Sequence, residues 1–201
     1  MFVQIIQART SDPAGVKAAV DRWRTDLAPG ATGWLGSTGG VTDDGTMIAM
    51  VRFESEEAAR RNSDRPEQGQ WWSQMSELLT SDPTFTESDD VVLDLVGDPN
   101  QAHFVQVMKG HGSDPQRARE LMGQHHDEWA AFRPDVLGSV VAMDESGDYT
   151  MAMYFTTEAE ARAGEKKQPP PELKAEMDEM MSLNEGPPEF FDLKHPWMTS
   201  P

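Results

Sequence analysis

The sequence contains one pattern twice, and the two copies are separated by a constant 102 residues. Phe2-Val3-Gln4 returns as Phe104-Val105-Gln106, and Leu35-Gly36-Ser37 returns as Leu137-Gly138-Ser139. A constant offset across separated blocks indicates a duplicated module. Because the units of solenoid proteins are roughly 20–50 residues long, this period predicts that each copy is a domain of its own.

The duplication predicts two domains with a short polar connection between them. The predicted boundaries are 1–97 for the first module, 98–103 for the linker, 104–194 for the second module and 195–201 for a C-terminal tail. Gly97-Asp98-Pro99-Asn100 has the turn-forming composition of a linker. A domain of about 100 residues is only marginally stable alone, so we expect the two copies to pack on each other.

Each module is predicted to be α+β, with the order β-α-β-β-α-β of a ferredoxin-like fold. The Asp-Pro pairs at 12–13 and 114–115 predict the start of the first helix, with Asp as N-cap. Apolar residues occur at both odd and even positions of the strands, and these positions point to opposite faces of the sheet. This pattern predicts that both sheet faces are covered. We therefore expect the modules to pack sheet to sheet. The predicted strands of the first copy are 2–8, 34–41, 47–53 and 91–96, and the last strand of the second copy is 190–193.

The charge balance limits the partners of this chain. A net charge of −18 disfavours binding to nucleic acid or to an anionic membrane surface. The absence of cysteine excludes disulfides and thiolate chemistry. The N-terminus begins directly with a strand-like segment, without a basic stretch followed by a long apolar run. These features predict a cytoplasmic protein.

The repeated strand openings, the two Leu-Gly-Ser strands and segment 49–58 (AMVRFESEEA) together resemble the dimeric α/β-barrel superfamily. The resemblance is strongest to its antibiotic biosynthesis monooxygenase-like domains. It implies a fused pseudo-dimeric α/β barrel, in which two sheets face each other and helices lie outside. It also implies a pocket between the sheet and the helices of a module. Members of this superfamily include cofactor-independent monooxygenases of aromatic polyketides and haem-degrading enzymes.

His125 is the first catalytic candidate. It is predicted to lie in the apolar stripe of the second module's first helix, where the first module has Trp23. A half-buried imidazole in that place titrates near neutral pH and can act as an acid or base. The alternative is a core histidine that neighbouring groups satisfy by hydrogen bonds. Because the histidines lack the i, i+4 spacing of helical ligand pairs, no metal site is predicted.

Gln106 is the second catalytic candidate, as a group that orients a substrate carbonyl, and Gln4 occupies the same strand position in the first module. The alternative is that both amides form hydrogen bonds across the interface between the modules. For the aromatic and methionine candidates, plain core packing is the alternative. The predicted substrate-binding residues are Trp129, His111, Gln4, Trp72, Met122 and Met153.

The resemblance implies a cofactor-independent, oxygenase-like enzyme that acts on a bulky apolar or aromatic small molecule. A non-catalytic protein that binds small molecules or assists assembly is the first alternative. A haem-binding module with His125 or His111 as iron ligand is the second. The expected state is a monomer with an internal pseudo-dimer, which leaves further homodimerisation open.

Overall fold

The computed structural model describes all 201 residues. The chain divides into two compact units. The first module, as the structure defines it, consists of residues 1–90 together with 195–201. The second module consists of residues 91–194. The division after residue 194 coincides with the predicted end of the second module, whereas the division after residue 90 precedes the predicted boundaries at 97 and 103.

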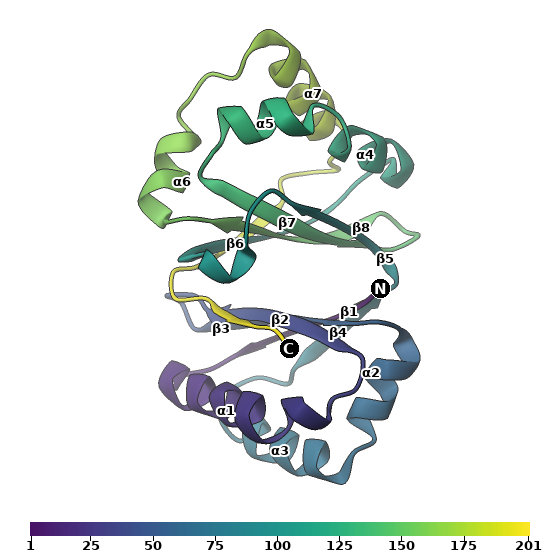
Figure 1. Cartoon of the computed structure of the whole chain (residues 1–201), viewed down its shortest axis with the longest axis vertical. Helices are drawn as coiled ribbons and strands as arrows, with labels where there is room; N and C mark the ends of the chain where they lie inside the picture. Colours follow the sequence, from purple (N-terminus) through teal and green to yellow (C-terminus); the bar gives the residue numbers. More distant parts are fainter. The chain divides into compact units, whose positions relative to one another are not determined.

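The first module contains one five-stranded sheet and three α-helices, and α1, α2 and α3 lie on one face of that sheet (Figure 1). A short 3₁₀ turn, Ala28–Gly30, follows α1. The elements from residues 1–90 are β1 (Phe2–Arg9), α1 (Pro13–Asp26), β2 (Trp34–Val41), β3 (Thr46–Phe53), α2 (Glu56–Ser63), α3 (Pro66–Ser76) and β4 (Thr84–Ser88).

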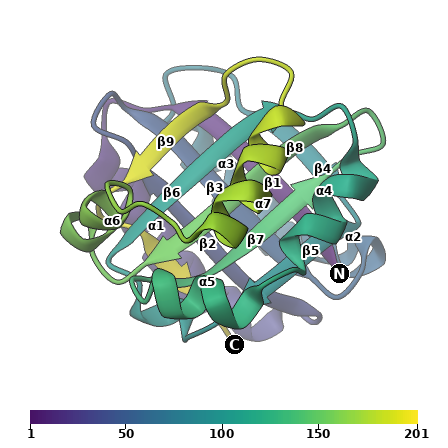
Figure 2. The ribbon, with the colours of Figure 1, turned by 90° about the horizontal axis from the view of Figure 1, so that it is seen from above.

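The second module repeats this arrangement with four helices on one face of a second five-stranded sheet (Figure 2). Its elements are β5 (Asp90–Leu95), β6 (Phe104–His111), α4 (Pro115–Met122), α5 (His126–Phe132), β7 (Val136–Met143), β8 (Asp148–Phe155), α6 (Glu158–Gly164), α7 (Pro171–Ser182) and β9 (Glu189–Leu193). The last strand of the chain is β10 (Trp197–Thr199).

Both sheets have the strand order of a ferredoxin-like fold, and their registers follow the sequence repeat. The first sheet is ordered β10-β2-β3-β1-β4, and the second is ordered β5-β7-β8-β6-β9. Phe2 pairs with Phe53, and Phe104 pairs with Phe155. A register shift follows residue 34 in β2 and residue 136 in β7. The predicted tandem of ferredoxin-like modules is therefore confirmed. Their sheet-to-sheet packing stays a prediction.

The outermost strands correct the predicted domain boundaries. The segment at 91–96, predicted as the last strand of the first module, forms β5 and pairs with β7 in the second sheet. The predicted tail at 195–201 contains β10, which pairs with β2 in the first sheet. The fourth strand of the first module is β4, whose residues are mostly exposed and polar, so its composition does not mark it as a strand.

Local sequence signals explain where the helices start. Asp12 accepts a hydrogen bond from the Gly15 amide, and Asp114 accepts one from the Arg117 amide, so both are N-caps as predicted. Thr157 caps α6 in the same way, by accepting from the Glu160 amide. The Asp-Gly turn between β2 and β3 places Gly45 at φ +85°, where glycine avoids the strain of a side chain.

The first helical region differs between the modules. In the first module α1 runs unbroken over 14 residues. In the second, the equivalent region breaks into α4 and α5, and His125 between them has a left-handed φ of 49°. Gly123, a poor helix former, stands at the break where the first module has Asp21. The predicted continuous stripe through His125 is therefore wrong.

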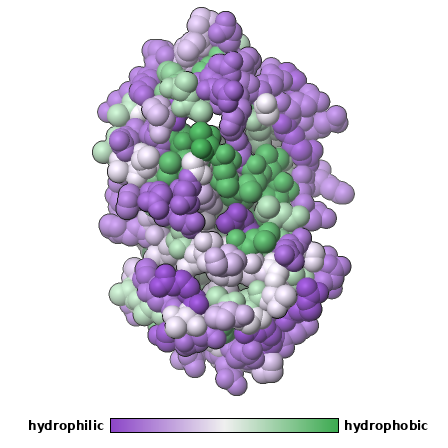
Figure 3. Space-filling model, viewed as in Figure 1, coloured by the Kyte–Doolittle hydropathy of each residue, from purple (hydrophilic) through white to green (hydrophobic).

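The helices are not membrane-spanning, because none combines the length and the apolar character that a bilayer crossing needs. Their outward faces are mainly hydrophilic, as the space-filling view shows for both modules (Figure 3). This distribution agrees with a negative charge that is spread over the surface of the chain.

Candidate functional site

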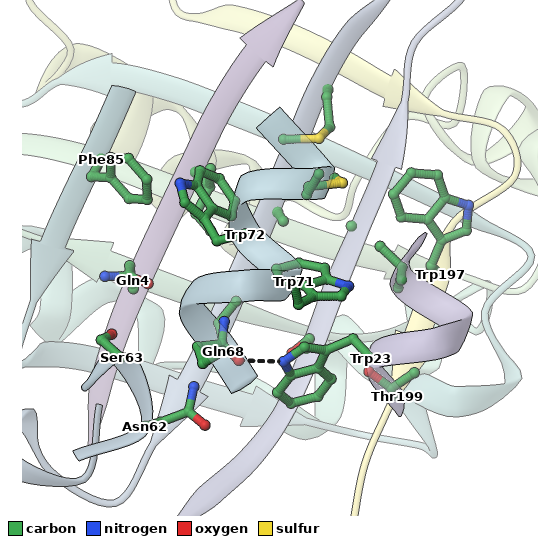
Figure 4. A pocket seen from close by; sticks show the side chains of 18 of the residues that line it. Gln4, Trp23, Asn62, Ser63, Gln68, Trp71, Trp72, Phe85, Trp197 and Thr199 are labelled. Atoms are coloured by element: carbon green, nitrogen blue, oxygen red, sulfur yellow. Dashed lines mark hydrogen bonds between the residues drawn. The ribbon is translucent and has the colours of Figure 1, made fainter. Parts of the chain in front are cut away.

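A cavity of about 290 Å³ lies between the sheet and the helices of the first module (Figure 4). This volume is near the lower end of the roughly 300–1,000 Å³ that is typical of small-molecule pockets. Strands β1, β2 and β3 form its floor, and residues of α1, α2 and α3 form its roof. Two further contributions come from the sheet edges: Phe85 of β4, and Trp197 with Thr199 of β10.

A connected series of aromatic rings runs through this module and forms much of the cavity wall. Trp71 and Trp72 are neighbours on α3 and both line the cavity, together with Trp23 of α1. Their rings contact one another edge to face or tilted, which is the geometry that aromatic pairs prefer. The centroid distances are 5.0 Å for Trp23–Trp34, 6.5 Å for Trp23–Trp71, 6.0 Å for Trp71–Trp72 and 5.4 Å for Trp72–Phe85.

Hydrogen bonds hold two of these indoles in place. Trp71 Nε1 donates to the Ala19 carbonyl at 2.9 Å, which ties α3 to α1. Trp23 Nε1 donates to Gln68 Oε1 at 2.7 Å. Because both indole N–H groups are used inside the protein, these rings present apolar surface to the cavity.

Two side-chain amides of the roof offer hydrogen-bond donors to the cavity. Asn62 is only 6% exposed, and its Oδ1 accepts from Arg65 Nη1 at 2.9 Å. The Gln68 oxygen is occupied by Trp23, as described above. The structure gives neither amide nitrogen a protein acceptor, and in Figure 4 both nitrogens lie on the side of Gln4 and Trp71.

Gln4, on the floor of the cavity, offers a hydrogen-bond acceptor where the roof offers donors. Its Nε2 donates to Glu87 Oε1 on the neighbouring strand β4 at 2.8 Å. A carboxylate only accepts, so this bond fixes the orientation of the amide and leaves Gln4 Oε1 as an acceptor. Ser37, Ser63 and Thr199 also line the cavity, and their hydroxyl groups complete the polar part of the lining.

The lining of this cavity contains no ionisable side chain. Its polar members are amides and hydroxyls, and its remaining members are aliphatic, aromatic or glycine. A charged ligand would lose its hydration shell without gaining a counter-ion, which costs several kcal/mol. The arrangement therefore suits an uncharged, flat molecule that carries a few oxygen atoms.

Of the predicted site residues, Gln4 and Trp72 line this cavity. The other six belong to the second module and lie outside it: His125, Gln106, Trp129, His111, Met122 and Met153. Neither histidine that was considered as a haem ligand borders the cavity. No group of three or more His, Asp or Glu side chains has the geometry to hold a metal ion.

His125 lies at the exposed junction of α4 and α5, away from the sheet on which it was expected to pack. Its Nδ1 is 2.7 Å from Glu176 Oε2, and Trp129 Nε1 donates to the other oxygen of Glu176 at 2.8 Å. The hydrogen bond with Glu176 raises the pKa of His125, and the Coulomb attraction of the same carboxylate adds to it. The helix break is the physical reason for the change in position.

Gln106 and His111 also have partners inside the second module. Gln106 Nε2 donates to Asp192 Oδ1 on the neighbouring strand at 2.9 Å, which repeats the bond of Gln4 in the first module. The bonds that the structure shows for the two glutamines thus lie within each sheet. His111 Nδ1 is 2.8 Å from Asp148 Oδ1, and this hydrogen bond raises the pKa of His111.

The second module fills the corresponding region differently. Arg162 pairs with Asp192, and its guanidinium lies 5.1 Å from the centre of the Phe104 ring. The duplicated positions of the cavity residues have also changed. Gly164, Pro170 and Leu173 stand where the first module has Asn62, Gln68 and Trp71. The set of donors and aromatic rings therefore belongs to the first module alone.

Sequence reasoning missed Asn62, Gln68 and Trp197 as cavity residues. Asn62 and Gln68 lie on either side of the break between α2 and α3, where helical periodicity no longer tells which face a residue occupies. Trp197 lies in the segment that was expected to be a tail. The sequence did contain one indication of the site. The polar and aromatic residues of the first copy are replaced at the matching positions of the second copy.

Comparisons with known proteins show the fold. No protein-family profile and no curated protein matches the sequence. A Lactobacillus acidophilus protein, provisionally described as a monooxygenase, matches with a TM-score of 0.73 and 10% identity over 99% of both chains. A Fusobacterium nucleatum protein with the same provisional description matches with a TM-score of 0.74 and 10% identity, over 99% of this chain and 94% of that one.

A third solved structure, of an anthrone oxidase-like protein, matches with a TM-score of 0.64 and 13% identity. The match covers 98% of this chain and 92% of that chain. All three likenesses extend over both modules, and this confirms the predicted resemblance at the level of the fold. The chain therefore has the same tandem fold as these three solved structures.

Proposed function

We propose that the first module binds a flat, uncharged aromatic ketone or phenol and oxidises it with molecular oxygen, without a bound cofactor. The observation that supports this proposal is the lining of the cavity, which combines tryptophan rings, oriented amides and no ionisable group. The rings match a planar π-system, and the amides match carbonyl and hydroxyl oxygens.

The proposed reaction needs no external reductant when the substrate carries an activated CH₂ group. In the balanced step, R₂CH₂ and O₂ give R₂C=O and H₂O, so the carbon is oxidised and both oxygen atoms are reduced. An anthrone is such a substrate, because loss of a proton from its CH₂ group leaves a delocalised phenolate. An anthrone oxidase-like protein shares this fold, although the likeness by itself does not transfer an activity.

The roles of the residues follow from their polarity. Asn62 Nδ2 and Gln68 Nε2 would donate to the substrate oxygen that gains negative charge when the proton is lost, as in an oxyanion hole. Trp71 and Trp72 would hold the ring system against the sheet. Because the lining offers no side-chain base, the proton would leave to water, with the acidity of the substrate itself as the driving force.

The test is turnover of an anthrone by the full chain, followed by oxygen uptake and by the absorbance of the quinone product. Replacing Asn62 or Gln68 by alanine should lower kcat about 10²- to 10³-fold, the usual cost of losing an oxyanion donor. Gln74→Ala is the matched control, since Gln74 is exposed on α3 and does not line the cavity.

Two outcomes would contradict parts of this proposal. If the chain binds the anthrone but consumes no oxygen, the first module is a binding site without this catalysis, which was the first alternative from the sequence. If Gln74→Ala and Gln68→Ala reduce turnover equally, the amides do not act on the substrate.

A further inference from the structure

Arg65 lies directly behind one of the cavity's donors without lining the cavity itself. Its side chain is 17% exposed. Nη1 donates to Asn62 Oδ1 at 2.9 Å and to the Leu27 carbonyl at 3.1 Å, and Nε donates to Glu67 Oε1 at 2.9 Å. The guanidinium is therefore fixed by groups from the end of α1, from α2 and from α3.

The backbone around Arg65 is shaped to hold this guanidinium. Arg65 precedes Pro66 and has an extended conformation, which ends the helical path between α2 and α3. A Cβ atom at Gly30 would lie 2.7 Å from Arg65 Nη2, so the glycine makes room for the close approach. In the second module, Lys167 and Gly164 replace Arg65 and Asn62, and no such pair exists.

The Arg65 guanidinium, as the hydrogen-bond partner of Asn62, decides which end of the Asn62 amide faces the cavity. A guanidinium can only donate, so the amide oxygen must turn toward it and the NH₂ group must turn away from it. The Trp23 indole, which also only donates, orients the Gln68 amide in the same sense. Two independent contacts thus give the roof of the cavity the same polarity.

We infer that Arg65 is a positioning residue that makes this cavity select ligands with a hydrogen-bond acceptor at the Asn62 amide. The inference rests on the proposed function of the first module and adds its selectivity. Without Arg65, the Asn62 amide is free to turn over and to present its oxygen instead. An acceptor ligand then loses a hydrogen bond, whereas a ligand of the same shape without oxygen loses nothing.

The experiment compares 9-fluorenone, a flat tricyclic ketone, with fluorene, the same ring system without the carbonyl. Binding to the full chain is followed by quenching of tryptophan fluorescence, because five of the six tryptophans lie in the first module. Arg65→Leu should weaken fluorenone binding about three- to ten-fold, the range of one net hydrogen bond, and leave fluorene binding unchanged. Arg61→Leu, at an exposed position of α2, is the matched control and should change neither.

A second comparison shows whether Arg65 acts through Asn62. In the Asn62→Ala background, Arg65→Leu should cause no further loss of fluorenone affinity, because the group that it orients is gone. Arg65→Met serves if the leucine variant does not fold. Methionine keeps a long unbranched side chain but has no N–H donor, so it should fill the space of the arginine stem and still reduce the preference for fluorenone.

The outcomes separate this inference from the proposed function. An equal loss for both ligands, or a loss that persists in the Asn62→Ala background, would give Arg65 a purely structural role and overturn the inference. Such a result would not contradict the proposed ligand site in the first module. If neither ligand binds to the unmodified chain, the proposed function fails, and the selectivity of Arg65 fails with it.

Discussion

At the scale of single residues, the two modules differ in what occupies the space between helices and sheet. The first module places neutral amides and indoles there, and the second places the Arg162–Asp192 pair beside Phe104. The exposed histidines of the second module are held by carboxylates, at Glu176 for His125 and at Asp148 for His111. These contacts have a consequence for stability that depends on pH.

Replacing His125 by glutamine should destabilise the second module more at about pH 6 than at about pH 8.5. The hydrogen bond to Glu176 raises the pKa of His125 above its value of 6.5 in the unfolded chain. Its contribution to folding is therefore complete below the unfolded pKa and is lost as the pH rises through the folded pKa. Thermal unfolding of both proteins at the two pH values measures the difference, and a difference independent of pH would contradict it.

The site residues that the sequence could reveal were those in regular elements. Gln4 and Trp72 lie in a strand and a helix, and their positions follow from the repeat and from helical periodicity. The orientation of the Asn62 amide depends on Arg65, which lies at the break between α2 and α3. The orientation of the Gln68 amide depends on Trp23, which belongs to a different helix far away in the sequence. A sequence does not encode such contacts in its periodicity.

At the scale of elements, the short strand β10 contributes to both the sheet and the cavity. It pairs with β2 through Trp197, Met198 and Thr199, opposite Gly39, Thr38 and Ser37. Trp197 and Thr199 line the cavity, and Met198 between them does not, as expected from the alternation of side chains along a strand. The last residues of the chain thus form part of the first module's site.

Trp197→Ala should weaken binding of a flat aromatic ligand by roughly ten-fold, because it removes a large apolar part of the cavity wall. Met198→Ala, one position along the same strand, is the control and should leave the affinity unchanged. Titration of both variants with 9-fluorenone, observed by calorimetry, gives the comparison. Equal affinities for the two variants would show that β10 does not form a wall of the site.

The edge strands β5 and β4 show how much of the fold the sequence can predict. The composition of 91–96 predicts a strand correctly, but nothing in it tells which sheet the strand joins. The polar strand β4 has only Phe85 as a large apolar residue, so its pairing with β1 is set by tertiary contacts. The capping residues Asp12 and Asp114, in contrast, act locally and were predicted correctly.

At the scale of the whole molecule, the duplication preserved the fold and changed the chemistry. Matching registers and matching bulges in the two sheets show that the backbone plan is the same. The cavity residues Asn62, Gln68 and Trp71 have no counterparts of the same type in the second copy. A duplicated chain can divide its tasks in this way, and we propose that the first module binds the ligand while the second contributes structure.

We propose that the ligand site lies in the first module, between Trp71, Trp72 and the face of the sheet that carries Gln4. A crystal structure of the full chain with a bound tricyclic aromatic ketone tests it most directly. We expect the ring system to lie beside these tryptophans, with its oxygen within hydrogen-bond distance of Asn62 Nδ2 or Gln68 Nε2. A ligand bound instead at His125 and Trp129 in the second module, with the first cavity unoccupied, would contradict it.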